Sequence, residues 1–268
     1  MSKEKTSKRL LSRRETLGLI GAAGVAALVG CGDDGKPGSG DATSTATEAA
    51  TGTVAATRTT AATASTTPLP VSCVVTPEQT EGPYFVDERL NRSDIRSDPT
   101  DGSVSEGVPL RLDLTVSSVN GAACTPLVGA VVDMWHCDAR GVYSDVSGGA
   151  GQSNTTGQKF LRGYQLTDAN GRVEFVTIYP GSYSGRTVHI HFKVRTDPDS
   201  ASGYEFTSQL FFDEAITDAV VARTPYSAKG TPDTRNATDN IFDSDLIVPL
   251  EVDGDGYNGA FHVGVNMA

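Results

Sequence analysis

Residues 109–119, with the sequence PLRLDLTVSSV, alternate apolar and polar side chains over most of their length. This period of two gives a β-strand one apolar and one polar face, and it does not fit a helix. Turn signals separate such segments, among them Asn120-Gly121 and the hairpin-like stretch 167–171, TDANG. No amphipathic pattern of ten or more residues indicates a helix. We therefore predict an all-β chain that folds as a β-sandwich. The expected strands are residues 109–119, 129–137, 160–166, 172–178, 187–195, 206–213, 246–252 and 260–265.

The first thirty residues differ from the rest of the chain. Basic residues precede an apolar run at 17–29 that is too short to cross a bilayer comfortably, an order typical of a signal peptide, here residues 1–30. The stretch 12–17, SRRETL, resembles a twin-arginine export signal, and a Sec signal with adjacent arginines is the alternative. The stretch 28–31, LVGC, resembles a bacterial lipobox, which implies a lipid on Cys31 rather than an incidental cysteine. We expect an exported protein of the bacterial cell envelope, bound to the membrane through this lipid only.

Residues 31–70 consist mostly of Thr, Ala, Ser and Gly. A segment with so few apolar side chains cannot offset its chain entropy by burial, so we expect a disordered tether. Apolar patterning begins near Val71, which leaves residues 71–268 as one domain large enough for a full core.

Charge and hydropathy exclude two classes of protein. The net charge of −11 argues against nucleic-acid binding, because neutralising phosphates requires a basic surface. Beyond the N-terminus no stretch of 18 or more apolar residues occurs, which excludes a polytopic membrane protein.

Besides the expected lipid-bearing Cys31, three cysteines remain in the mature chain, namely Cys73, Cys124 and Cys137. An exported domain permits disulfides, but three cysteines leave one over. An extended strand between Cys124 and Cys137 would separate them by roughly 25 Å, against a Cα–Cα limit of about 7 Å for a disulfide, so that pair is disfavoured. A bond from Cys73 to either of the others and a fully reduced set both stay open.

Residues 187–194, TVHIHFKV, carry the sharpest chemical signal. In a strand the apolar residues share one face, and His189 and His191 point together from the other. Their Cβ atoms would lie roughly 6.5–7 Å apart, which allows both rings to bind one metal ion. A polar strand face without a metal is the simpler alternative.

Two tyrosines lie close to this motif in the sequence. Tyr183 ends the turn that leads into the histidine strand, and Tyr143 follows the strand at 129–137. Two imidazoles and two phenolates form a hard, anionic set that favours Fe(III) over Zn(II). Tyr164 and Tyr179 are nearby alternatives, and each tyrosine could instead be an ordinary rim aromatic. A zinc or copper site with His189 and His191 alone is a further reading.

Taken together, these motifs resemble the intradiol ring-cleavage dioxygenases, the family of the protocatechuate and catechol dioxygenases. The resemblance covers residues 76–213 and implies a transthyretin-like β-sandwich. The matching segments are TPEQTEGPY at 76–84, GVY at 141–143, TDANG at 167–171, IYPGSY at 178–183, RTVHIHF at 186–192 and SQLFF at 208–212.

The resemblance implies a non-haem Fe(3+) site whose protein ligands are Tyr143, Tyr183, His189 and His191. The substrates would be a catechol-type ring and O2, and the product would be a muconate-type diacid. Tyr183 would be released on substrate binding and take up a substrate proton.

The same resemblance assigns roles to three further residues. Arg186 would stabilise negative charge on the bound ring, Gln209 would orient substrate or oxygen, and Tyr84 would touch the substrate. The competing hypothesis is a non-catalytic, transthyretin-like binding module, because fold does not fix function. Assembly into a homo-oligomer stays open.

Overall fold

The computed structural model describes residues 73–149, 151–197, 199 and 203–267. The expected signal peptide and the whole of the expected tether, including Cys31, lie outside these residues. Within the described part, none of the helices is long and apolar enough to cross a membrane.

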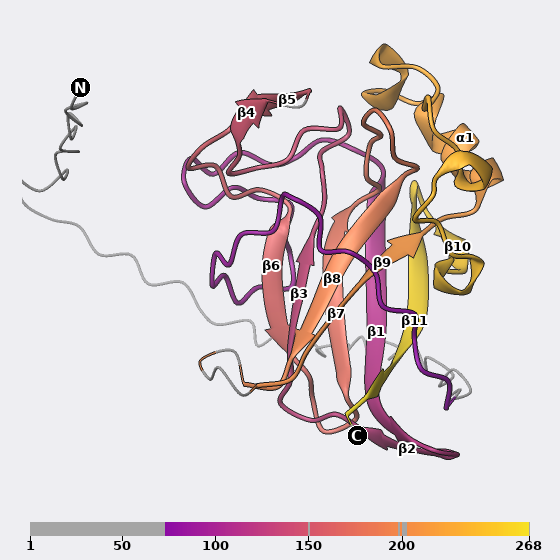
Figure 1. Cartoon of the computed structure of the whole chain (residues 1–268). Helices are drawn as coiled ribbons and strands as arrows, with labels where there is room; N and C mark the ends of the chain where they lie inside the picture. Colours follow the sequence, from indigo (N-terminus) through magenta and orange to yellow (C-terminus); the bar gives the residue numbers. More distant parts are fainter. Residues whose placement is uncertain (1–72, 150, 198, 200–202, 268) are drawn as a thin grey trace, which may run out of the picture. The chain divides into compact units, whose positions relative to one another are not determined.

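Two β-sheets, whose strands pair mostly in antiparallel fashion, form the layers of a β-sandwich (Figure 1). The order of the first sheet is β6 (Arg162–Leu166), β3 (Val131–Trp135), β8 (His189–Arg195) and β9 (Glu205–Phe211). The second contains β10 (Leu250–Asp253), β11 (Gly256–Asn266), β1 (Pro109–Asn120) and β2 (Ala123–Pro126), and β7 (Arg172–Ile178) also pairs with β1. Only the β1–β11 pair among these strands is parallel within the described residues.

Short elements complete the described chain. They are β4 (Ser147–Gly149), β5 (Gln152–Asn154), α1 (Glu214–Val221), η1 (Tyr226–Ala228), η2 (Asn236–Thr238) and η3 (Ser244–Leu246), where η denotes a 3₁₀ turn. The helix α1 begins after Asp213, whose side chain accepts a hydrogen bond from the amide of Ala215. With eight residues, it agrees with the absence of any longer helical pattern in the sequence.

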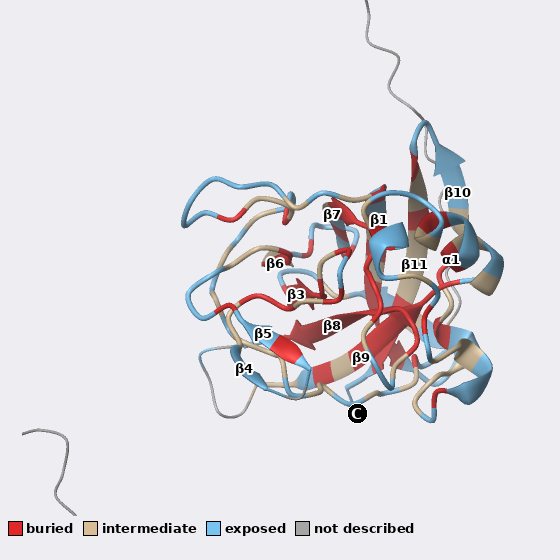
Figure 2. Ribbon diagram, turned by 90° about the horizontal axis from the view of Figure 1, so that it is seen from above, coloured by how far each residue is buried: buried red, intermediate tan, exposed pale blue. Residues whose placement is uncertain are grey.

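The core lies between the two sheets and follows the period of two. Alternate residues of β1, such as Leu112 and Leu114, are fully buried, and they share one hydrophobic cluster with Ile190 and Phe192 of β8. The opposite face of β8 carries His189, His191, Lys193 and Arg195, as the alternation predicts. These polar residues are also buried, and Figure 2 shows β8 in the colour of buried residues throughout.

Residues 79–90, which we call the covering segment, bury the polar face of β8. The amide of Gln79 donates to the carbonyl of Thr207 on β9 at 2.9 Å. Two ion pairs follow along the segment, Glu81 with Lys193 and Asp87 with Arg195, the latter at 3.0 Å. A metal or substrate on this face of β8 would therefore be enclosed between the first sheet and the covering segment.

The prediction of one continuous strand at residues 246–252 is wrong. Val248 donates its amide to the carbonyl of Phe211 in the first sheet at 2.9 Å, whereas β10 joins the second sheet only from Leu250. Pro249 lies between them and has no amide to continue either ladder. The segment thus divides between the two layers.

The structure resolves the cysteine alternatives. Cys73 and Cys124 form a disulfide with their Cα atoms 5.4 Å apart, and Cys137 is a free, buried thiol. The disfavoured bond between Cys124 and Cys137 is absent from the described residues.

Candidate active site

The two histidines of β8 lie side by side beneath the covering segment. Their Nε2 atoms are 3.1 Å apart, and the exposed fractions of His189 and His191 are 2% and 1%. His189 Nδ1 lies 2.6 Å from the carbonyl oxygen of Thr187. A carbonyl only accepts, so Nδ1 carries the proton and the Nε2 lone pair of His189 is available to a metal.

Tyr183 reaches the histidine pair from the turn that precedes β8. Its hydroxyl lies 3.1 Å from His189 Nε2 and donates to that nitrogen. Tyr143 arrives from the loop after β3, and its ring centroid lies 5.7 Å from that of Tyr183 and 6.4 Å from that of His191. The four residues predicted as metal ligands are therefore brought together in one cluster, which we call the ligand cluster.

The two tyrosine-bearing loops are tied to each other. Lys229 donates from Nζ to the carbonyls of Arg140 and Ser182, at 2.9 and 2.5 Å. The Asp138 side chain accepts the amides of Arg140 and Val142, at 2.9 and 2.8 Å, and so shapes the turn before Tyr143. Both tyrosine loops are therefore held in place by hydrogen bonds from outside β8.

Burial keeps the ligand cluster neutral when no metal is bound. It lowers the pKa of His189 to about 3, helped by the charge of Arg186, and it lowers the pKa of His191 well below the ordinary value. Burial also raises the pKa of Tyr183 to about 12 and that of Tyr143 well above its usual range. Neutral imidazoles are the form that binds metals, whereas the phenols need a cation to ionise.

The donor set fits a ferric ion. The Tyr143 hydroxyl is buried without a hydrogen-bond partner among the described residues, an arrangement that is costly unless another group satisfies the oxygen. No group of three or more His, Cys, Asp or Glu side chains that could hold a metal occurs in the described part of the chain. A metal at His189 and His191 would therefore take its further ligands from the phenols, which are hard oxygen donors.

Arg186 and Gln209 also meet beside the ligand cluster. Arg186 Nη2 donates to Gln209 Oε1 at 2.6 Å, and Gln209 Nε2 donates to the carbonyl of Thr80 in the covering segment at 2.8 Å. Gln209 lies opposite His191 in the β8–β9 pairing. The structure thus places both residues beside the histidines of the ligand cluster.

Tyr84 of the covering segment packs directly on the two phenols. Its ring stacks on that of Tyr143, with centroids 4.5 Å apart and planes at 29°, and meets the edge of Tyr183 at 6.1 Å. This half-buried ring therefore contacts both tyrosines of the ligand cluster.

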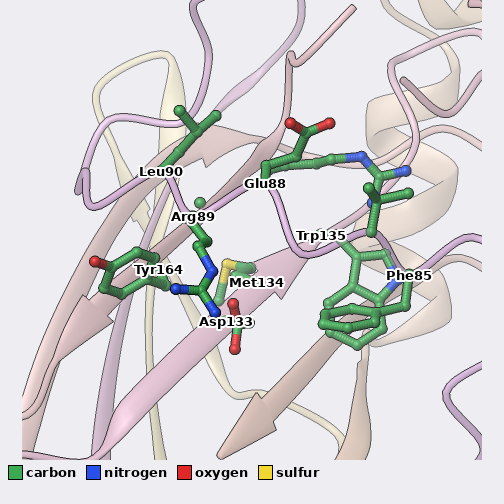
Figure 3. A pocket seen from close by; sticks show the side chains of 11 residues that line it. Phe85, Glu88, Arg89, Leu90, Asp133, Met134, Trp135 and Tyr164 are labelled. Carbon is green, nitrogen blue, oxygen red and sulfur yellow. The ribbon is translucent and has the colours of Figure 1, made fainter. Parts of the chain in front are cut away.

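The alternative tyrosines lie elsewhere. Tyr179 is buried in the main core and its hydroxyl lies 2.6 Å from Thr217 Oγ1. Tyr164 lines a small cavity between the covering segment, β3 and β6 (Figure 3). That cavity measures about 10 Å³, room for about one water molecule, whereas sites for small organic ligands span about 300–1,000 Å³. It is too small to be a substrate site.

Sequence reasoning missed Trp135, Lys229 and Asp239. The Trp135 ring stacks on His191 with centroids 5.0 Å apart and planes at 5°, because β3 pairs with β8 in that register. Trp135 is the single tryptophan of the chain, and that was the one signal available. Lys229 and Asp239 lie in irregular segments without a motif.

Comparisons with known proteins identify the family of the chain. Residues 80–244, more than half of the chain, match a protein family described as Dioxygenase. Catechol 1,2-dioxygenase 1 of Acinetobacter lwoffii is 30% identical over 145 residues, 46% of this chain and 42% of that protein. Chlorocatechol 1,2-dioxygenase of Pseudomonas putida is 29% identical over 153 residues, 50% of this chain and 52% of that protein. The chain thus spans about half the length of these curated relatives.

Two solved structures match a larger share of the chain than these relatives do. An intradiol ring-cleavage dioxygenase from Tetranychus urticae is 30% identical with a TM-score of 0.62, and the match covers 72% of this chain and 95% of that one. The dioxygenase domain of a dioxygenase–carbohydrate-binding protein fusion from Streptomyces sp. SirexAA-E is 32% identical with a TM-score of 0.52, covering 73% and 100%. The chain belongs to the intradiol ring-cleavage dioxygenase family.

Proposed function

We propose that the protein is a non-haem Fe(III) dioxygenase that cleaves a catechol-type ring between its two hydroxyl-bearing carbons. It consumes O2 and yields a muconate-type diacid. The observation that carries the proposal is the meeting of two imidazoles and two phenols in one buried cluster beside Arg186. The names of the catechol and chlorocatechol 1,2-dioxygenases among its relatives support the substrate class.

Tyr143, Tyr183, His189 and His191 would hold the iron. When bound there, a ferric ion supplies a Lewis acid for the catechol oxygens and withdraws electron density from the ring. Tyr183 is the ligand suited to release, because it is less buried than Tyr143 and its hydroxyl already faces His189.

Side chains of the protein would accept the catechol proton and stabilise the negative charge on the bound ring. Burial raises the pKa of Tyr183 to about 12 when no metal is bound, and a Tyr183 phenolate released from the iron would accept a proton from a catechol hydroxyl. Arg186, fixed by Gln209, places a permanent positive charge where the bound ring becomes anionic. Tyr84, which stacks on Tyr143, would contact the bound ring with its aromatic side chain.

The visible spectrum of the purified, iron-loaded protein tests this proposal. We expect a red-brown phenolate-to-Fe(III) band that shifts when catechol is added under nitrogen. Tyr143→Phe should weaken or shift the band, while Tyr164→Phe, which removes a hydroxyl beside the small cavity, should leave it unchanged. A protein that stays colourless after anaerobic iron loading and reoxidation would refute the ferric site and favour the non-catalytic binding module.

We also propose that the chain is exported by the twin-arginine route and anchored by a lipid on Cys31. The sequence motifs support the export route and the lipid anchor. The Cys73–Cys124 disulfide supports export alone, because such bonds persist in oxidising compartments. Intact-mass spectrometry of the envelope protein should find a chain that starts at Cys31 and carries acyl groups. Cys31→Ser should release the protein from the membrane fraction. A free thiol on Cys31, or a mature chain that starts elsewhere, contradicts the proposal.

A further inference from the structure

Asp239 is a buried carboxylate with no assigned role. It follows η2, and its side chain is 1% exposed. One oxygen, Oδ2, accepts both the Arg186 Nε–H and the Thr187 amide, each at 2.8 Å. The other oxygen, Oδ1, accepts the amide of Ile241 at 2.8 Å. Two backbone amides therefore fix the carboxylate, so its position does not depend on Arg186.

The guanidinium of Arg186 is held along two edges. Asp239 binds Nε, and Gln209 binds Nη2 at 2.6 Å. Rotation about the Arg186 side-chain axis would break one or both of these hydrogen bonds. The side chain is only 14% exposed, so water cannot readily replace either partner. Gln209, which accepts the hydrogen bond from Nη2, lies opposite His191 in the β8–β9 pairing, so the guanidinium lies beside the ligand cluster.

We propose that Asp239 is a positioning residue for the proposed ring cleavage, and that it fixes the direction of the Arg186 guanidinium toward the ligand cluster. The inference rests on the proposed function, because the value of a fixed guanidinium is the charge that develops on the bound ring. A charge that is already oriented costs no reorganisation during the reaction. A displaced one stabilises the transition state less, even though the charge itself remains.

Asp239 also contacts the Thr187 amide, and the effect of that contact must be measured separately from the positioning of Arg186. The Thr187 amide binds Asp239, and the Thr187 carbonyl accepts the proton of His189 Nδ1 at 2.6 Å. Loss of the carboxylate therefore also acts on a proposed iron ligand. Iron content and the charge-transfer band report the effect on His189. The orientation of the Arg186 guanidinium needs a separate measurement.

The test compares Asp239→Asn with Asp243→Asn in the full chain. Asp243 is the matched control, because its carboxylate also accepts the amide two residues later, that of Asp245 at 2.9 Å, but binds no arginine among the described residues. For each variant we would measure kcat and KM for catechol and the iron content. Both aspartate changes would be repeated in an Arg186→Met background. The Nε–H resonance of Arg186, assigned with Arg186→Lys, would be followed by NMR in metal-free protein.

We expect Asp239→Asn to keep its iron and to lower kcat by about tenfold to 100-fold with little change in KM. In the Arg186→Met background the same change should add almost nothing, because it acts through a group already removed. The slowly exchanging Nε–H of Arg186 should be lost. Asp243→Asn should leave all of these quantities unchanged.

Opposite results would overturn the inference. These are a kcat within twofold of wild type for Asp239→Asn, or a loss that adds fully to that of Arg186→Met. If Asp239→Asn does not fold, the exchange rate of the Arg186 Nε–H in the wild-type protein provides the test. Rapid exchange would contradict a hydrogen bond that holds the guanidinium on Asp239. If the wild-type protein shows no ring-cleavage activity, the proposed function is refuted. The Nε–H resonance of Arg186 would still show whether Arg186 is hydrogen-bonded to Asp239.

Discussion

Replacement of His191 by alanine is expected to leave a folded domain that no longer retains iron. His191 supplies one of the two nitrogens of the ligand cluster, and its Nε2 lies 3.1 Å from that of His189. Loss of a group that merely orients a metal ligand already weakens binding by about 10–100-fold, so loss of a ligand itself should exceed that range. Iron content measured by mass spectrometry should fall to background, and ring cleavage should fall with it.

Two further variants make the result interpretable. His191→Phe keeps a ring to stack on Trp135 but offers no nitrogen, so it separates iron loss from lost packing. His262→Gln changes a partly buried histidine of β11 whose Nε2 lies 3.1 Å from Ser117 Oγ, and it should retain full iron content. Unchanged iron stoichiometry in His191→Ala would rule out this ligand set.

The second large effect is expected from Gly141→Ala in the loop before Tyr143. Gly141 has φ +83°, and an added Cβ would lie 2.0 Å from the carbonyl oxygen of Ser182, a backbone atom of the Tyr183 loop. The two tyrosine loops would have to separate. We expect a loss of about 3–5 kcal/mol in the free energy of unfolding, measured with urea. The melting temperature should fall by about 10 °C, and the charge-transfer band of the iron-loaded protein should weaken.

Gly157→Ala is the matched control for this prediction. Gly157 has φ +87°, but no atom lies within 4 Å of an added Cβ. It therefore carries the backbone strain without the clash, and it should cost only about 1–2 kcal/mol. Equal losses in the two variants would show that the close approach of the tyrosine loops contributes nothing.

The sequence predicted those parts of the site that depend on local geometry. Because a strand alternates its faces, the spacing of His189 and His191 was enough to place both rings together on the side away from the core. The positions of Tyr143 and Tyr183 in the sequence suggested them as further ligands, and the family resemblance added Arg186. The structure brings all three near the histidines.

Contacts between segments that are distant in the sequence could not be predicted from local patterns. Trp135 reaches His191 only through the register of β3 against β8, and sequence alternation does not specify which strands pair. Asp239 lies 53 positions from Arg186 in a segment without regular pattern, so no local signal connects them. Similarly, Cys73 and Cys124 are 51 positions apart, and their pairing depends on where the chain enters the sandwich.

The Cys73–Cys124 disulfide has a mechanical consequence. It joins the first described residue to β2, at the edge of the second sheet, and just beyond it the amide of Thr76 donates to Gly264 of β11 at 2.8 Å. A pulling force on the chain before residue 73 therefore enters the domain through the second sheet. The covering segment, with Tyr84 on the phenols, lies downstream of both attachments. If the chain is anchored at Cys31 as we propose, tension on the anchor would thus be borne by the second sheet and not by the covering segment over the ligand cluster.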